Sequence, residues 1–205
     1  DIMAKKGHKK KRAPSPVAKK NRYHGAAIAA PVPPSFPDVR REEGHLVPKA
    51  IISKKAWSKI AEVVDMDTGR ECGALLIGNI LRDRVTGMNI ALVDDAYSDG
   101  EHGGTSDYRF TAALQAQCVN YVYREYGEGK HVIGTVHSHG NHDAFFSSVD
   151  YRMMTSRRSE ELHMVLSPSH GTYVVTFKDL ENNFVDADLD VSAIMNSFRY
   201  RRDDD

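Results

Sequence analysis

Residues 131–150 have the sequence HVIGTVHSHGNHDAFFSSVD, and this stretch decides the fold and the chemistry. It begins with a short β-rich run, His131–Val136, which leads into the His-x-His pair of His137 and His139. Side chains alternate along a strand with a period of two, so both imidazoles project from one side of the sheet and can bind one metal ion. Asp150 supplies a third ligand. The fourth tetrahedral position is left for water, which is typical of a catalytic zinc site.

Two further features strengthen this interpretation, because a His-x-His pair alone is weak evidence for a metal site. Ser147 and Asp150 are three residues apart, which places hydroxyl and carboxylate on one face of the first turn of a helix. Glu71 is the acidic residue at the head of an apolar run over residues 71–81. A carboxylate at that place must be solvated, paired or functional, since burying it without a partner is costly.

These residues together give the sequence a resemblance to the JAMM (MPN-plus, JAB-type) zinc metallopeptidases. The motif of that family is a Glu at the start of a Gly-Leu-Leu-Leu-Gly-like strand, then His-Ser/Thr-His-Pro, then Ser-x-x-Asp after a short spacer. This chain has ECGALLIG at residues 71–78, HSHG at 137–140 and SSVD at 147–150. The order of expected elements over roughly residues 47–180 is also similar to the family's core.

The resemblance implies an α/β fold, an MPN (cytidine-deaminase-like) domain with a central mixed β-sheet flanked by helices. It implies a Zn²⁺-dependent hydrolase of peptide or isopeptide bonds. The implied partner is a protein or peptide substrate, with ubiquitin-like and sulfur-carrier protein C-termini as candidates. His137, His139 and Asp150 would bind the zinc ion. Glu71 would hold the zinc water and act as general base, and Ser147 would donate a hydrogen bond to the developing oxyanion.

The residues around the ligands are expected to line a cleft without binding metal; they are Ser138, Gly140 and His142. Gly140 stands where the family usually has Pro, so we expect a looser turn and a more mobile loop over residues 140–146. No long insertion follows Asp150 of the kind that shapes substrate binding in eukaryotic deubiquitinating members. In this respect the chain resembles the compact prokaryotic or viral members.

Two alternative interpretations stay open at this point. The first is a metallo-β-lactamase-type hydrolase, because the spacing of His137, His139 and His142 is similar to its His-x-His-x-Asp-His signature, although Asn141 replaces the Asp. That fold would make His142 a ligand and give Glu71 no role. The second is a catalytically silent MPN scaffold whose basic arm anchors it to nucleic acid or to a large assembly.

The charges of the chain are unevenly distributed, although its 205 residues contain 28 Lys+Arg and 28 Asp+Glu. Residues 1–22 carry nine basic side chains and one acidic one, and seven of the eight prolines lie within the first 48 residues. Proline disfavours continuous helix or strand. We therefore predict a disordered basic arm over residues 1–45, the metallopeptidase domain over 46–198 and a charged tail over 199–205. The basic groups of residues 5–22 could bind nucleic acid or an acidic assembly, or simply be solvated.

Hydrophobic periodicity and turn residues predict the elements of the domain. Helices are expected over residues 53–64, 111–126, 149–159 and 191–198, strands over 71–81, 88–94, 131–136, 163–166 and 172–178, and a long loop over 97–108. Trp57 is expected in the core. The histidines at positions 131, 163 and 170 are expected at edges or on the surface.

The cysteine content favours a reducing compartment such as the cytoplasm, because Cys72 and Cys118 are the only two cysteines. A place in a viral particle is also compatible with the sequence. No apolar run approaches the roughly 18–20 residues that a membrane span needs, so we expect no membrane partner. The sequence does not fix the oligomeric state.

Overall fold

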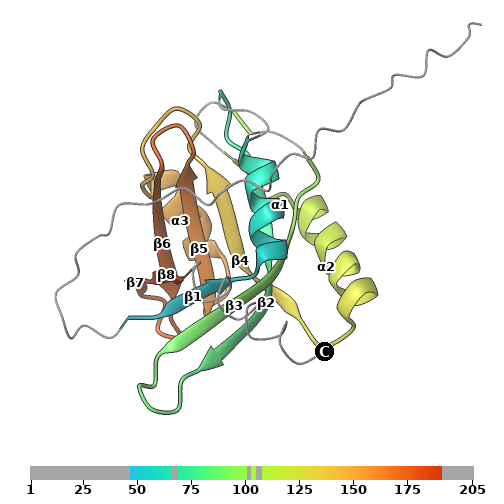
Figure 1. Cartoon of the computed structure of the whole chain (residues 1–205), viewed down its shortest axis with the longest axis vertical. Helices are drawn as coiled ribbons and strands as arrows, with labels where there is room; N and C mark the ends of the chain where they lie inside the picture. Colours follow the sequence, from blue (N-terminus) through green and yellow to red (C-terminus); the bar gives the residue numbers. More distant parts are fainter. Residues whose placement is uncertain (1–46, 66–68, 101–102, 105–107, 191–205) are drawn as a thin grey trace, which may run out of the picture.

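The computed structural model of the chain describes residues 47–65, 69–100, 103–104 and 108–190. The arm over residues 1–45, the helix expected over 191–198 and the tail over 199–205 lie outside these residues. The described part of the chain forms three helices and eight strands, shown in Figure 1. In chain order they are β1 (Lys49–Ile52), α1 (Lys54–Asp65), β2 (Gly73–Arg82), β3 (Asn89–Tyr97), α2 (Ala112–Tyr126), β4 (His131–Ser138), α3 (Ser148–Ser156), β5 (Glu161–Ser167), β6 (Thr172–Lys178), β7 (Phe184–Asp186) and β8 (Asp188–Asp190).

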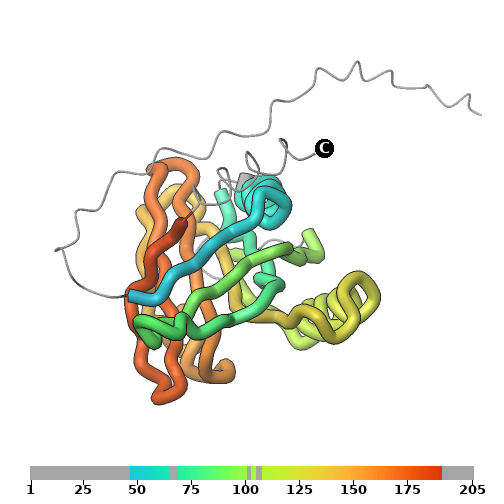
Figure 2. Tube along the Cα trace, turned by 60° about the horizontal axis from the view of Figure 1, so that its bottom comes forward, coloured from blue at the N-terminus to red at the C-terminus, as the bar shows by residue number. Residues whose placement is uncertain are grey.

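All eight strands belong to one mixed sheet with the order β7-β6-β5-β4-β2-β3-β1-β8. Strands β1 and β3, β1 and β8, and β4 and β5 pair in parallel, and the other pairs are antiparallel. β7 and β8 follow each other in the chain but lie at opposite ends of this order, because the segment first pairs with β6 and then with β1. The sheet is therefore strongly curled, as the tube in Figure 2 shows. The predicted α/β class and mixed sheet are confirmed.

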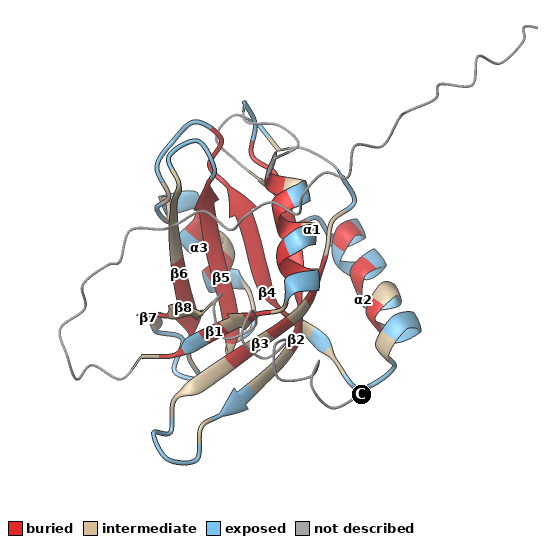
Figure 3. Ribbon diagram, in the orientation of Figure 1, coloured by how far each residue is buried: buried red, intermediate tan, exposed pale blue. Residues whose placement is uncertain are grey.

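The two faces of the curled sheet are covered by different helices. Alternate residues such as Leu76 of β2 and Phe177 of β6 belong to one buried cluster with the apolar side of α1, where Trp57 is 8% exposed and belongs to the core as expected. On the opposite face, Leu75 packs against the apolar side of α2, which includes Leu114. Buried positions concentrate on the central strands and the inner sides of the helices (Figure 3). This division follows from the period of two along each strand.

The starts of the first two helices agree with the sequence signals. Ser53 caps α1, since its Oγ accepts a hydrogen bond from the N–H of Ala56 at 3.0 Å. Thr111 caps α2 in the same way, with its Oγ1 accepting from Leu114 N–H at 3.1 Å. These hydroxyls satisfy N–H groups that have no partner within the helix.

Several expectations need correction. The expected helix over residues 149–159 ends at Ser156, because Arg157 takes an extended backbone conformation with φ −88° and ψ 168°. Strand β5 is longer than expected and is buried along its whole length. His163 of β5 is 1% exposed, so its expected place at an edge or on the surface is wrong. β5 has β4 on one side and β6 on the other, and α3 lies behind it in Figure 1.

The predicted likeness to the cytidine deaminase fold stays a prediction. Among the described residues, no helix combines the length and the apolar character needed to cross a lipid bilayer.

Candidate metal centre

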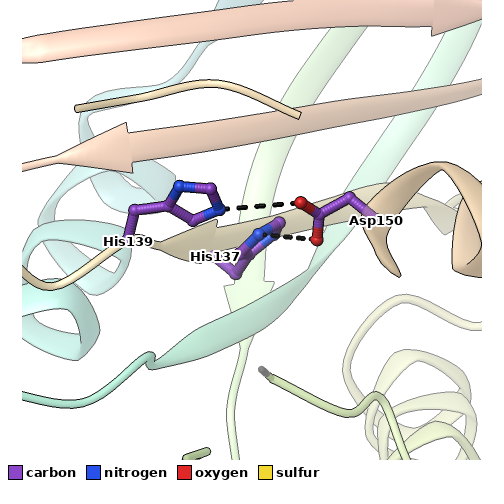
Figure 4. Close-up of side chains that lie close together, drawn as sticks. All are labelled: His137, His139 and Asp150. Atoms are coloured by element: carbon purple, nitrogen blue, oxygen red, sulfur yellow. Dashed lines mark ion pairs between the residues drawn. The ribbon is translucent and has the colours of Figure 1, made fainter. Parts of the chain in front are cut away.

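Three predicted ligands meet where β4 ends and α3 begins. His137 lies near the end of β4, His139 directly follows that strand, and Asp150 lies in the first turn of α3. Figure 4 shows both imidazoles turned toward the carboxylate. Asp150 Oδ1 is 3.0 Å from His137 Nε2, and Asp150 Oδ2 is 3.6 Å from His139 Nε2. One ligand atom from each residue lies within 4.8 Å of the other two, so the three side chains can hold one metal ion.

The state of the two imidazoles fits a bound metal ion. His139 Nδ1 lies 3.3 Å from the carbonyl oxygen of Asp143, and this hydrogen bond assigns the ring proton to Nδ1 and leaves the Nε2 lone pair facing the site. His137 Nε2 is buried and faces Asp150 Oδ1 at 3.0 Å, a contact that lacks the geometry of a hydrogen bond. A ring nitrogen and a carboxylate oxygen that face each other in this way suit a shared metal ion. The donor set of two nitrogens and one carboxylate suits zinc among other divalent metals.

The surroundings shift the pKa of Asp150 and the pKa of His139 in opposite directions. Burial alone would raise the pKa of Asp150, but the two imidazoles and the Ser147 hydroxyl outweigh burial and hold it well below its usual range. Burial alone would lower the pKa of His139, but the Asp150 and Glu71 carboxylates outweigh burial and raise it. The site therefore has a strong attraction for positive charge in its centre.

Asp150 is held in place by the start of its own helix. Ser147 is the N-cap of α3, and its N–H and Oγ both donate to Asp150 Oδ2, at 2.7 and 2.6 Å. In return, the N–H of Asp150 donates to Ser147 Oγ at 3.2 Å. This capping box satisfies the helix end and fixes the carboxylate that faces the imidazoles. The spacing of three residues thus brings the Ser147 hydroxyl and the Asp150 carboxylate together on the first turn of the helix, as the sequence predicted.

Glu71 approaches the site from β2. The register pairs Gly73 with His137, and Cys72 exchanges hydrogen bonds with Ser138 next to that pair, at 3.0 and 2.8 Å. Continued by one more step, this register brings Glu71 opposite His139, on the same face of the sheet. Glu71 is 5% exposed, and its charge contributes to the raised pKa of His139. Glu71 is therefore a buried carboxylate that acts electrostatically on the group of His137, His139 and Asp150.

The three residues expected to line the cleft have different environments. Ser138 is buried, and its Oγ accepts the hydrogen bond from Cys72 N–H. Gly140 has φ +53°, a left-handed conformation that proline cannot adopt. His142 is exposed and is not part of the metal-binding group found among the described residues. A metallo-β-lactamase-type site, which needs His142 as a ligand, is therefore contradicted.

The loop after the ligands is tied to the turn between β5 and β6, contrary to the looser loop that we expected. Ser169 Oγ donates to the carbonyl of Gly140 at 2.9 Å, and Ser167 Oγ donates to the carbonyl of His142 at 2.5 Å. Ala144 N–H donates to Thr172 Oγ1 at 3.1 Å. Each bond crosses from the loop to strands β5 and β6 or the turn between them, which restrains residues 140–144.

Two notable residues were missed by the sequence analysis, one beside His139 and one at the C-terminal end of α3. Phe145 packs edge to face against His139, with ring centres 4.7 Å apart, and is half exposed. Its position in the short spacer between His139 and Ser147 could have indicated that it lies beside the site. Lys178 is buried below α3, and as the last residue of an alternating strand it gave no sign of this. A cavity of about 360 Å³ lies elsewhere, between α1, β3 and α2, and none of the metal-binding side chains lines it.

Comparisons with known proteins agree with this arrangement. A sequence model of the prokaryotic homologs of the JAB domain matches residues 53–179. Among solved structures, the solution structure of a protein from Desulfitobacterium hafniense is similar with a TM-score of 0.52 and 16% identity, covering 70% of this chain and 94% of that one. That likeness concerns the fold alone. No curated protein matches the sequence. The family match covers more than half of the chain and includes the segments that carry Glu71, both imidazoles and Asp150, so the chain belongs to the prokaryotic JAB-domain family.

Proposed function

We propose that the chain is a zinc-dependent metallopeptidase that hydrolyses peptide or isopeptide bonds. The JAB-domain family contains both metallopeptidases and inactive members, so membership alone does not decide the activity. The observation that carries the proposal is the convergence of His137, His139 and Asp150, together with the buried Glu71, whose charge acts on His139. An inactive member has no chemical need for a complete donor set with a carboxylate beside it.

The proposed roles follow from where the side chains lie. When bound, a zinc ion supplies a Lewis acid that polarises the scissile carbonyl and lets water lose a proton near neutral pH. Glu71 accepts that proton as general base and returns it to the leaving amine. Its charge acts on His139, while it is not one of the three residues grouped as possible metal ligands, and this suits a general base beside the site.

Ser147 is proposed to donate a hydrogen bond to the developing oxyanion. Its hydroxyl donates to Asp150 Oδ2 at 2.6 Å in this structure, so the proposed role requires a rotation of the side chain toward the substrate. The Ser147 N–H also donates to that carboxylate oxygen, at 2.7 Å. Asp150 therefore keeps one partner from Ser147 when the hydroxyl turns away.

The proposed substrates are the C-termini of ubiquitin-like or sulfur-carrier proteins. The two imidazoles are 2% and 4% exposed and Asp150 is 8% exposed, so the face of a folded protein cannot reach them. An extended C-terminal tail is thin enough to enter such a site. Phe145, half exposed beside His139, offers an apolar contact at the entrance.

A cleavage assay tests this function with the full chain loaded with zinc. The substrates are fusions of ubiquitin-like and sulfur-carrier proteins through their C-terminal glycine to a fluorescent protein. We expect cleavage that a chelator abolishes and added Zn²⁺ restores. Glu71→Gln should lower the rate by about 10²-fold or more while retaining zinc. The matched control is Glu62→Gln, an exposed position on α1, which should cleave at the native rate. Zinc-loaded native protein that cleaves none of the fusions would favour the silent scaffold.

A further inference from the structure

Lys178 is a buried cation that the proposed mechanism does not use. It is the last residue of β6, lies opposite Glu161 of β5 and is 1% exposed. Its ammonium group donates to three main-chain carbonyl oxygens, those of Met154 at 3.0 Å, Thr155 at 3.2 Å and Arg157 at 2.6 Å. A lysine ammonium has three N–H donors, so these carbonyls can satisfy all of them.

The three carbonyls lie at the C-terminal end of α3. A helix leaves its last carbonyls without partners inside the helix, and they need a cap or water. Arg157 ends α3 with an extended backbone, so no left-handed glycine closes the helix here. Lys178 takes that place from the neighbouring sheet, and its positive charge also suits the negative end of the helix dipole.

Few buried residues fix α3. Asp150 and Met154 are buried among its nine positions. Partly buried Met153 also packs against the cluster that includes Leu114 of α2, and the ring of Tyr151 contacts Phe184 of β7. Beyond the helix, Arg157 Nε donates to Glu161 Oε2 at 2.6 Å, which fixes the turn that follows. The hydrogen bonds from Lys178 are the buried polar contacts that tie the C-terminal end of α3 to β6.

The burial of Lys178 makes this arrangement sensitive to small movements. An ammonium group taken out of water is tolerated only while its donors have acceptors. A shift of α3 along the sheet would separate Lys178 from the carbonyls and leave a buried cation unsatisfied. The position of the helix and the position of the lysine are thus coupled.

The residues of the proposed metal centre come from two different secondary-structure elements. His137 and His139 are placed by β4, in the middle of the sheet, whereas Asp150 is placed by α3. We propose that Lys178 is a positioning residue of the metal centre. By capping α3 from β6, it holds Asp150 at the distance from the two imidazoles that metal binding requires. This inference rests on the proposed function, because it takes the three residues to be zinc ligands.

The test compares zinc affinity in full-length native protein, Lys178→Met and Lys130→Met. Lys130→Met is the matched control, since Lys130 forms an ion pair with Asp94 at 2.8 Å at the start of β4, away from α3. Competition with a chelating indicator should show about 10-fold or greater loss of zinc affinity for Lys178→Met, as for other outer-sphere changes. Lys130→Met should stay within about twofold of native. The visible spectrum of the Co²⁺-loaded proteins should change only in Lys178→Met, because a merely structural role lowers stability without altering the ligand geometry.

The possible outcomes separate this inference from the proposed function. A folded Lys178→Met protein with native zinc affinity and a native Co²⁺ spectrum would overturn the inference and leave the function intact. If that variant does not fold, Lys178→Gln is measured by the same criteria. Native protein that binds no zinc would contradict the proposed function first. In that case, amide hydrogen exchange over residues 148–156 still tests the capping: faster exchange in Lys178→Met supports it, and unchanged exchange refutes it.

Discussion

At the scale of single residues, Asp150 serves two purposes at once. Its carboxylate closes the capping box with Ser147 and also faces the imidazoles of His137 and His139. A Ser-x-x-Asp spacing at a helix start is common for capping alone, so the spacing by itself does not show a metal site. The distinction comes from the second oxygen of the carboxylate, which lies 3.0 Å from His137 Nε2.

Gly140 gives a prediction about the turn after the ligands. Its φ of +53° is open to glycine, whereas proline is held near −65°. Gly140→Pro, which restores the residue usual in the resembled family, should therefore destabilise the fold by more than about 1 kcal/mol and weaken zinc binding. Chemical unfolding and zinc competition measure both effects. The control is Asn141→Ala, a change at the exposed neighbouring position, which should leave stability and zinc binding close to native. A Pro variant as stable as native would contradict this account of the turn.

His163 gives a prediction about pH. Burial lowers its pKa to about 3, with smaller effects of Arg157 and Lys178, and its Nδ1 is 2.9 Å from Thr135 Oγ1. The unfolded chain binds this proton near pH 6.5. The contribution of neutral His163 to the free energy of unfolding is therefore complete above pH 6.5 and is lost as the pH falls toward 3. Between pH 7 and pH 4.5, the free energy of unfolding should fall by about 2 kcal/mol less in His163→Asn than in native protein. Unfolding free energies at both pH values measure this, and equal losses would be contrary evidence.

At the scale of elements, α1, α2 and β3 meet at one buried carboxylate. Asp95 of β3 is 0% exposed and lies 2.8 and 2.7 Å from the ammonium groups of Lys55 and Lys59 of α1. The hydroxyls of Tyr121 and Tyr126 of α2 donate to it at 2.7 and 2.6 Å. Burial alone would raise the pKa of Asp95, but these donors outweigh burial and hold it well below its usual range. The two helices are thus joined to the sheet by a polar cluster.

Asp95→Asn is expected to lower the free energy of unfolding by about 2–3 kcal/mol. The loss should be smaller than for a fully buried ion pair, because the lysine side chains are 55% and 37% exposed and regain water. Urea unfolding measures the change. The control is Asp94→Asn, whose ion pair with Lys130 is partly exposed and should be worth less than about 1 kcal/mol. Equal losses of unfolding free energy in the two variants would contradict a larger contribution of the buried cluster to stability.

The elements also show what the sequence can predict. The apolar periods and the residues at the helix ends, Ser53 and Gly127, predicted α1 and α2, because these signals act locally. Strands β1, β7 and β8 were not predicted, since they have only three or four residues. β1 and β8 are in addition defined by pairing with each other across most of the described chain. The convergence of His137, His139 and Asp150 was predictable from motif spacing. The burial of His163 and Lys178 was not, because it depends on how α3 covers β5 and β6.

At the scale of the whole molecule, the charges of the sequence are divided between a basic N-terminal segment and an acidic remainder. The nine basic side chains of residues 5–22 stand against a net charge of −7 over residues 49–205. We expect full-length protein to bind a short DNA duplex at low salt. The logarithm of its affinity should fall linearly with the logarithm of the salt concentration, with a slope of about −0.9 for each phosphate that the protein neutralises. A variant in which Lys9, Lys10, Lys11 and Arg12 are all replaced by Gln should bind more weakly and with a shallower salt dependence, which fluorescence anisotropy measures. Absence of binding at low salt would favour a solvated arm.

The central claim is that one zinc ion is held by His137, His139 and Asp150. The most direct measurement is zinc per chain by mass spectrometry on protein purified without a histidine tag, for native, Asp150→Ala and Asp143→Ala. Asp143 is the matched control, because it contributes its main-chain carbonyl, which alanine retains, to His139. The account predicts about one zinc per chain in native protein and in Asp143→Ala, and a marked loss in Asp150→Ala. Little zinc in native protein after reconstitution, or equal zinc in all three, would contradict it.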